Sequence, residues 1–270
     1  MQLDLIIEQE DFSDEKVLIG LSAGINSAAV LVWLSEYPDE YKPKELHLFY
    51  AHMEEHSPDS FPFVKDLIRY ARTKFKNVFV KITRNSVIRF FEEQKMIPHP
   101  SVSPCTRLLK ILPMHEYMAL NGIKIDLVGY VREEAKRRTN RMAKKTKSEV
   151  KNRSVVVDGI SKHMIISDKT NEYCFHSVKR AIGWYPKIYD IKHNGKRVFT
   201  HNNCLPCKNY NEQEFANVEI YYPEYYDEAQ DLGDRLGKFW GRKKGDFFTT
   251  FGRTETEIKD LPGCQVCLFD

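Results

Sequence analysis

Four of the six cysteines fall in two short pairs in the last third of the chain. The pairs are Cys204-Leu-Pro-Cys207 and Cys264-Gln-Val-Cys267, and in each of them two residues separate the two thiols. A turn with this spacing points both sulfur atoms at one ion, so two turns complete a tetrahedral four-thiolate site for Zn²⁺ or a [4Fe–4S] cluster. We therefore predict one metal centre built from these four residues. A redox-active dithiol at either pair and a chance spacing are the alternatives.

The stretch VLIGLSAGINSAAV, residues 17–30, combines small residues with the expected start of a helix. A buried strand is predicted to run into Ser22 to Gly24, and a helix to begin at about Ser27. Small residues let the backbone approach an anion, and the first N–H groups of a helix are donors at its positive end. We expect a phosphate or pyrophosphate here. A plain turn with Ser27 as the N-cap is the alternative, and neither a Walker A loop nor G-x-G-x-x-G is present.

Positive charge is concentrated in residues 132–153. This segment holds ten Lys or Arg against three Glu, although the formal net charge of the whole chain is only +3. A basic helix and loop, with Tyr130, Trp184 and Tyr185 nearby, could follow a phosphate backbone. A solvated insertion is the alternative reading. The small overall charge excludes a histone-like basic protein.

The elements that must position these residues follow from the apolar pattern. Apolar runs alternate with helical patterns over the first half, which predicts βαβ units and a parallel sheet. The predicted strands are Val17–Leu21, Glu45–His52, Val78–Ile82 and Ile125–Tyr130, and the predicted helices are Ser27–Glu36, Asp59–Phe75, Ser86–Gln94, Thr106–Leu120 and Tyr225–Leu236. Short β-like runs are expected at Val155–Val157, Met164–Ile166 and Tyr173–His176.

We therefore expect an α/β fold with a doubly wound, mostly parallel, Rossmann-like sheet and a small Cys₄ module. The expected domains are 1–180, which carries the basic insertion, and 181–270. The chain has 270 residues and 42% apolar residues, enough for a sizeable core. Its longest apolar run, Ala28–Leu34, is far shorter than a membrane helix requires, and the acidic first residues do not resemble a secretory signal. A cytoplasmic location without a membrane partner is the expectation.

The loop at residues 22–27 resembles the S-G-G-x-D-S signature of the PP-loop family. Ser22, Gly24 and Ser27 match the signature, whereas Ala23 and Asn26 replace a glycine and an aspartate. Alanine is tolerable here if its position does not need a positive φ. Asn26 keeps a side-chain acceptor but loses the charge that would help to position a metal ion.

Three further stretches resemble the PP-loop branch that contains 3′-phosphoadenylylsulfate (PAPS) reductase. AHMEEHSPDS, residues 51–60, resembles D-T-G-x-E-x-P-E-T, with histidines at 52 and 56 where acids are usual. PCTRLLKILP, residues 104–113, resembles a Cys, basic, Lys, Pro pattern that lines the anionic end of the substrate. GYVREEAKRR, residues 129–138, resembles G-x-R-x-x-E-S-x-x-R. The resemblance covers roughly residues 17 to 140.

The resemblance implies an adenine nucleotide across the carboxyl ends of the strands. ATP-using members cleave between the α and β phosphates and adenylate a substrate oxygen, with Mg²⁺ and basic side chains neutralising charge. The implied nucleotide contacts are Ser22, Ala23, Gly24, Asn26, Ser27, Ala51, His52, Met53, Gly129, Tyr130 and Glu134, and the implied catalytic residues are Lys110, Arg107, Cys105 and Arg138.

We predict an ATP-dependent, PAPS reductase-like enzyme that adenylates a substrate, with nucleic acid as a candidate acceptor and sulfur transfer as a candidate extension. Related enzymes that thiolate tRNA or place sulfur in DNA combine a PP-loop with iron–sulfur clusters, so we favour [4Fe–4S] over Zn²⁺. The candidate partners are tRNA or DNA on residues 132–153, a sulfur donor protein, and a second copy in a homodimer.

Two alternatives remain open. One is a thiol-dependent reductase of PAPS or its unphosphorylated analogue, with Cys105 or a tail cysteine as nucleophile. The tail PGCQVCLFD argues against it, because true reductases end in an E-C-G-x-H-type motif. The other is a non-catalytic protein that binds a nucleotide or a nucleic acid.

Overall fold

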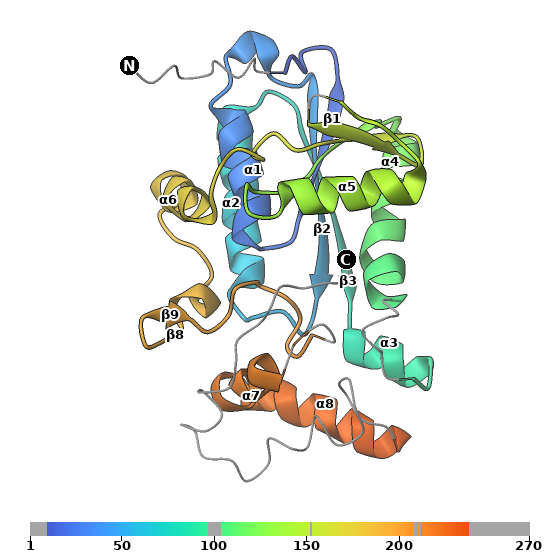
Figure 1. Cartoon of the computed structure of the whole chain (residues 1–270), viewed down its shortest axis with the longest axis vertical. Coiled ribbons are helices and arrows are strands. Elements are labelled where there is room, and N and C mark those ends of the chain that lie inside the picture. Colours follow the sequence, from blue (N-terminus) through green and yellow to red (C-terminus); the bar gives the residue numbers. More distant parts are fainter. Residues whose placement is uncertain (1–9, 97–103, 152, 208–209, 211, 238–270) are drawn as a thin grey trace. The chain divides into compact units, whose positions relative to one another are not determined.

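The computed structural model describes residues 10–96, 104–151, 153–207, 210 and 212–237. Within them the predicted α/β class is confirmed, because helices flank a mostly parallel sheet (Figure 1). Cys264 and Cys267, two of the four predicted metal ligands, lie outside the described residues. No helix in the described part is long and apolar enough to cross a membrane.

The central sheet of the described chain has seven strands in the order β3-β2-β1-β4-β7-β6-β5. β1 pairs in parallel with β2 and β4, and β4 pairs in parallel with β7, whereas β6 is antiparallel to β5 and β7. The chain builds outward from β1 to β3 and then returns to place β4 on the other side of β1. The carboxyl ends of β1 and β4 therefore meet at a topological switch point, where open α/β sheets bind their ligands. The bounds are β1 Lys16–Leu21, β2 Glu45–Met53, β3 Val78–Asn85, β4 Ile125–Leu127, β5 Val150–Lys151, β6 Ser154–Val157 and β7 Ile160–His163.

The helices begin and end close to most of the predicted positions. They are α1 Ile25–Ser35, α2 Ser60–Lys74, α3 Val87–Glu93, α4 Leu112–Asn121, α5 Ala135–Thr146, α6 Asn171–Ile182, α7 Glu212–Tyr221 and α8 Pro223–Leu236. Short elements are the 3₁₀ helices η1 Asp39–Tyr41 and η3 Lys187–Asp190, the π-helix η2 Thr106–Ile111, and a hairpin of β8 Lys192–His193 and β9 Lys196–Arg197.

The chain divides into two compact units, each built from segments that are distant in sequence. Unit 1 comprises Met1–Tyr50, Phe63–Lys81 and Glu116–Tyr185, and unit 2 comprises Ala51–Pro62, Ile82–His115 and Pro186–Asp270. The last segment of unit 1 thus ends at Tyr185. The predicted domains 1–180 and 181–270 remain a prediction.

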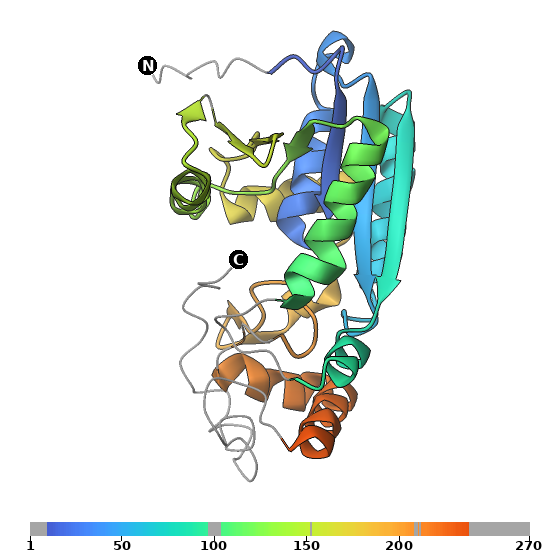
Figure 2. The same cartoon turned by 90° about the vertical axis from the view of Figure 1, so that its right-hand side faces the viewer.

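In unit 1, helices cover both faces of the sheet, which is the doubly wound arrangement. On one face, α1 packs on β1, and the Ser35 hydroxyl lies 2.7 Å from the Tyr70 hydroxyl of α2. α6 lies beside α1. On the other face, Tyr117 of α4 lies 2.9 Å from the His47 ring and packs on Phe49. Figures 1 and 2 show α1 and α2 on one side of the strands and α4 on the opposite side.

Three sequence predictions about elements are wrong. The fourth strand ends at Leu127 rather than Tyr130, and Met164–Ile166 is not a strand, since β7 ends at His163. Tyr173–His176 lies inside α6. Its aromatic run has strand propensity, but the Thr170 hydroxyl caps the helix by accepting from the Tyr173 N–H at 3.2 Å. Gly183 then ends the helix in the left-handed conformation, with φ 92°.

Candidate functional site

Two serine hydroxyls fix the loop that follows β1 in unit 1. The Ser27 hydroxyl donates to the Gly24 carbonyl at 3.0 Å and accepts from the Ser22 N–H at 3.1 Å. The Ser22 hydroxyl lies 3.1 Å from that of Ser27 and accepts from the Gly24 N–H at 3.3 Å. Because Gly24 is the N-cap of α1, Asn26 and Ser27 lie in the first turn, where amides have no carbonyl partner within the helix. This geometry is suited to binding an anion.

Ala23 adopts a left-handed backbone conformation. Its φ is 58°, in the left-handed region, and its side chain is completely buried. The left-handed region costs an L-residue about 1–2 kcal/mol, which is why glycine usually occupies such positions. The condition under which alanine is a tolerable replacement for glycine, a position without a positive φ, is therefore not met.

Gly129 lies against the start of α1, two residues after β4 ends. A Cβ atom at this position would be 2.8 Å from the Asn26 carbonyl carbon, 2.9 Å from its oxygen and 3.0 Å from the Ser27 nitrogen. Real Cβ atoms essentially never come within 3.0 Å of backbone. Only glycine therefore lets the segment after β4 approach the loop after β1, which gives this predicted site residue a steric role.

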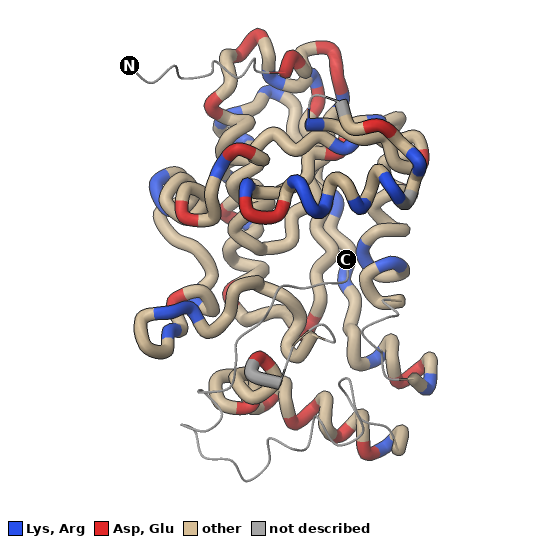
Figure 3. The backbone as a smooth tube through the Cα atoms, viewed as in Figure 1, with Lys and Arg blue, Asp and Glu red and all other residues tan. Residues whose placement is uncertain are grey.

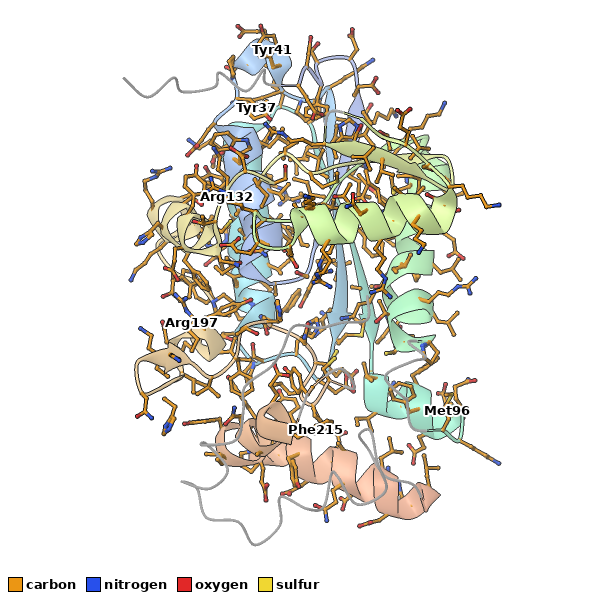
Figure 4. All side chains as sticks on the ribbon, in the orientation of Figure 1. Tyr37, Tyr41, Met96, Arg132, Arg197 and Phe215 are labelled. Atoms are coloured by element: carbon orange, nitrogen blue, oxygen red, sulfur yellow. The ribbon has the colours of Figure 1, made fainter. Side chains whose placement is uncertain are left out.

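Three further predicted residues, Tyr130, Glu134 and Arg138, are brought together in unit 1. The Arg138 Nε lies 2.6 Å from the Glu134 carboxylate, and its guanidinium carbon lies 5.1 Å from the centre of the Tyr130 ring. Both charged side chains are mostly buried. Arg138 is thus an oriented cation whose charge Glu134 balances. Arg132, labelled in Figure 4, is exposed and donates two bonds to the Asp168 carbonyl, at 2.9 and 2.6 Å.

Ala51, His52 and Met53 are the last three residues of β2 and belong to unit 2. The His52 ring lies 4.9 Å from that of Phe61, and burial together with the charge of Arg84 lowers its pKa. His56 is buried, and the pKa of its ring is well below the usual value because of burial and the Lys110 charge. Both rings therefore favour the neutral form.

The first cysteine pair lies in unit 2 on an anchored turn. The Asn202 side chain accepts from the Ser57 hydroxyl at 3.1 Å and donates to that of Ser60 at 2.9 Å. The Leu205 N–H donates to the Glu55 carbonyl at 2.8 Å. Cys204 is buried and Cys207 is half-buried. Hydrogen bonds on both sides of Cys204 therefore hold this turn to the segment that follows β2.

Lys110 and Cys105 accompany Cys204 in unit 2. The Lys110 Nζ lies 3.9 Å from the Cys204 sulfur, and Cys105 interacts with that sulfur electrostatically. Burial raises the pKa of the Cys204 thiol to about 11, although the Lys110 charge acts in the opposite direction. Cys105 directly precedes the π-helix η2, which carries Lys110 and the exposed Arg107. Such helices are rare and often occur at functional sites.

Sequence reasoning missed Glu55, whose side chain is 3% exposed. Its carboxylate accepts from the Ser86 hydroxyl at 2.5 Å and from the N–H groups of Val87 and Ile88 at 2.9 and 3.0 Å. It therefore caps α3 while its own carbonyl holds the cysteine turn. The signal was weak, because nothing in EEHS distinguishes a buried acid from a solvated one.

The predicted four-thiolate centre remains a prediction. Among the described residues, no group of three or more His, Cys, Asp or Glu side chains is arranged to hold a metal ion. The second cysteine pair is outside that part of the chain.

No family model matches the sequence, and no curated protein sequence matches it. Among solved structures, the chain is similar to a phosphoadenylyl-sulfate (PAPS) reductase from Candida auris in a phosphate complex, at 14% identity and a TM-score of 0.41, over 65% of this chain and 77% of that one. It is also similar to the U34-tRNA thiolase NcsA from Methanococcus maripaludis with its [4Fe-4S] cluster, at 12% identity and a TM-score of 0.48, over 92% and 85%. At these identities the likeness concerns the fold.

Proposed function

We propose that this protein is a PP-loop enzyme of the PAPS reductase-like branch, which binds ATP at the loop after β1. The observation that carries the proposal is the contact of Gly129 with Asn26 and Ser27, at the switch point of the sheet. Two further observations support the proposal: Ser22 and Ser27 fix the loop by hydrogen bonds, and the amides in the first turn of α1 have no carbonyl partner within the helix. Together these features supply backbone donors for phosphate oxygens.

The proposed reaction is attack of an acceptor oxygen on the α-phosphorus of ATP. The bond from that phosphorus to the bridging oxygen of the β-phosphate breaks, and pyrophosphate leaves with the electron pair. The backbone donors at residues 22–27 would stabilise the leaving group, and Mg²⁺ would neutralise part of its charge. Asn26 can offer a metal ion only a neutral carbonyl ligand, so a bound nucleotide must supply most of the anionic ligands.

We further propose that Lys110 and Arg107 stabilise the anionic substrate, and that the cysteine turn contributes to a four-thiolate centre. Cys204 and Cys207, with Cys264 and Cys267, would hold a [4Fe–4S] cluster or Zn²⁺. Anchoring by Asn202 and Glu55 supports a ligand role for the turn, because metal ligands need fixed orientations. Since burial favours the protonated Cys204 thiol, metal binding must release a proton there.

The reaction is tested with ATP labelled at the α-phosphate, Mg²⁺ and bulk tRNA. The expected products are pyrophosphate and RNA that carries the labelled AMP group, from which attack by water or another nucleophile releases AMP. ADP and phosphate as products, or sulfite release from PAPS, would show a different reaction. If ATP binds but is never consumed, the enzymatic part of the proposal fails.

The metal centre is tested by anaerobic purification and analysis of iron, sulfide and zinc. Iron with sulfide and an absorbance band at about 400 nm is expected for a cluster. Cys204→Ser should lower the bound metal at least severalfold, whereas Cys174→Ser should not, because Cys174 is a buried cysteine of α6 in unit 1. Metal-free protein, or equal metal in both variants, would contradict the assignment.

A further inference from the structure

α5 is a helix with six Lys or Arg and no acidic residue within Ala135–Thr146. The cations whose side chains are exposed on and directly after it are Lys136, Arg137, Arg141, Lys144 and Lys147. These five residues are here named the α5 cationic face. Figure 3 shows the positive residues following one another along this helix.

The opposite side of α5 faces the protein. Ala135 and Thr139 are buried, Arg138 is paired with Glu134, and the Met142 sulfur lies 3.9 Å from the Tyr130 hydroxyl. Arg137, Arg141 and Lys144 follow one another at intervals of four and three residues, so they share one outward side of the helix. The exposed charges therefore form a row rather than a scattered set.

The positive charges of this row disfavour formation of the helix that carries them. Lys136 and Arg137 lie in its first turn, where the helix dipole disfavours positive charge, and Arg137 and Arg141 are like charges four residues apart. The two acids before the helix are engaged elsewhere, since Glu134 pairs with Arg138 and Glu133 accepts from the Asn171 N–H at 3.1 Å. A sequence that breaks local rules in this way often does so at a functional site.

The dimensions and chemistry of the row fit a nucleic-acid strand. From Arg137 to Lys144 the helix rises about 10 Å, which corresponds to about three phosphates along one strand of a duplex. A membrane-surface helix would also need an apolar side available to the lipid. In α5 the apolar residues Ala135 and Met142 are buried or half-buried against the protein.

We propose that the α5 cationic face binds the phosphodiester backbone of a nucleic acid, which is the acceptor class of the reaction proposed above. Binding at this surface depends on the α5 cationic face and not on the proposed ATP site. Only the statement that the bound nucleic acid is also the acceptor rests on the proposed function.

The test measures the binding of fluorescein-labelled single-stranded RNA by anisotropy, over about 50 to 200 mM salt. The surface variant is Arg137→Gln, Arg141→Gln and Lys144→Gln in the full-length protein. The matched control is Arg72→Gln, Lys74→Gln and Lys76→Gln, which removes three exposed cations at and just after the end of α2. Each lost phosphate contact should reduce the slope of log affinity against log salt by about 0.7, so the surface variant should lose about 2.

The control variant should keep the wild-type slope. Thermal unfolding of both variants checks that they remain folded at the temperature of the binding assay. The proposal is overturned if both variants change the slope equally, if the wild type binds no RNA, or if it binds phosphatidylserine vesicles in preference to RNA.

ATP binding by the same variants separates the two proposals. If ATP binds and RNA does not, this inference fails while the proposed nucleotide site stands. If RNA binds at α5 and ATP does not bind, the surface stands and the acceptor role fails together with the proposed function.

Discussion

At the residue scale, Ala23 shows how a motif position can be occupied by a less suitable residue. The loop needs a left-handed backbone conformation there, at φ 58°, although the chain offers alanine where the family signature has glycine. The side chain is completely buried, so the methyl group also contributes to packing. Backbone strain and methyl burial therefore act in opposite directions at one residue.

This balance gives a prediction for two substitutions. Ala23→Gly should change the free energy of unfolding by less than about 1 kcal/mol, because relief of strain offsets the lost methyl group. Ala23→Val should destabilise the protein by at least about 2 kcal/mol, since a β-branched residue fits a positive φ poorly and the site is buried. Denaturant unfolding of both variants checks this. Equal effects of glycine and valine would mean that the backbone is not left-handed at this position.

The loop at residues 22–27 could be predicted from the sequence, because its small residues follow a buried strand and precede a helix. The resemblance also pointed to Gly129. Its steric reason could not be predicted, since the contact with Asn26 joins residues about a hundred positions apart. Glu55 was missed for the same reason, because its three donors lie about thirty residues further along the chain.

At the element scale, β4 and β7 are joined by a charged pair as well as by their parallel ladder. Asp126 is opposite Lys162 in the register, its carboxylate lies 2.6 Å from the lysine Nζ, and its side chain is only 3% exposed. Removal of one partner of a buried pair leaves an uncompensated charge, which costs more than the pair contributes when intact.

Asp126→Ala should therefore lower the free energy of unfolding by about 3 kcal/mol, because Lys162 loses its counter-charge. The double variant Asp126→Leu with Lys162→Met should be clearly more stable than this single variant. Arg180→Ala, which breaks the exposed pair with Glu36, serves as the control and should cost less than about 1 kcal/mol. A double variant as unstable as Asp126→Ala would show that the charges do not compensate each other.

The predicted strands and helices of the first half were largely confirmed, because their apolar periodicity is strong. α6 was misread because Tyr-Cys-Phe-His has the composition of a strand, whereas the capping bond at Thr170, the left-handed end at Gly183 and packing beside α1 favour a helix. A prediction from one sequence depends on the composition of several neighbouring residues. Capping bonds at the ends of a segment also influence whether it forms a helix or a strand.

At the scale of the whole molecule, buried neutral histidines predict how stability depends on pH. The pKa values of His47 in unit 1 and His56 in unit 2 are lowered, chiefly by burial. In the unfolded chain these rings return to about the usual value of 6.5, so below that pH the unfolded state binds more protons than the folded state. The free energy of unfolding should therefore be highest above about pH 6.5 and fall as the pH decreases below it.

Denaturant unfolding between about pH 7 and pH 5 measures this dependence. His47→Gln should reduce the loss of stability on acidification, because one of the responsible rings is removed. His176→Gln, at an exposed position of α6, should leave the loss unchanged. The explanation fails if the wild type is equally stable at both pH values or if the two variants behave alike.

The organisation into two units could not be predicted from the sequence, because each unit gathers segments from three parts of the chain. The change in composition near residue 180 lies close to only one of the points where the chain passes between the units, the one at Tyr185 and Pro186.

Calorimetric titration with ATP measures whether an adenine nucleotide binds at the loop after β1, as proposed above. Gly129→Ala should weaken ATP binding more than tenfold, because its Cβ would lie 2.8 Å from the Asn26 backbone. Gly159→Ala is the matched control, since its φ of 79° imposes strain while nothing lies within 4 Å. It should cost about 1–2 kcal/mol of stability and leave the ATP affinity unchanged. An ATP affinity that is the same in the wild type and Gly129→Ala, or no ATP binding by the wild type, would contradict the account.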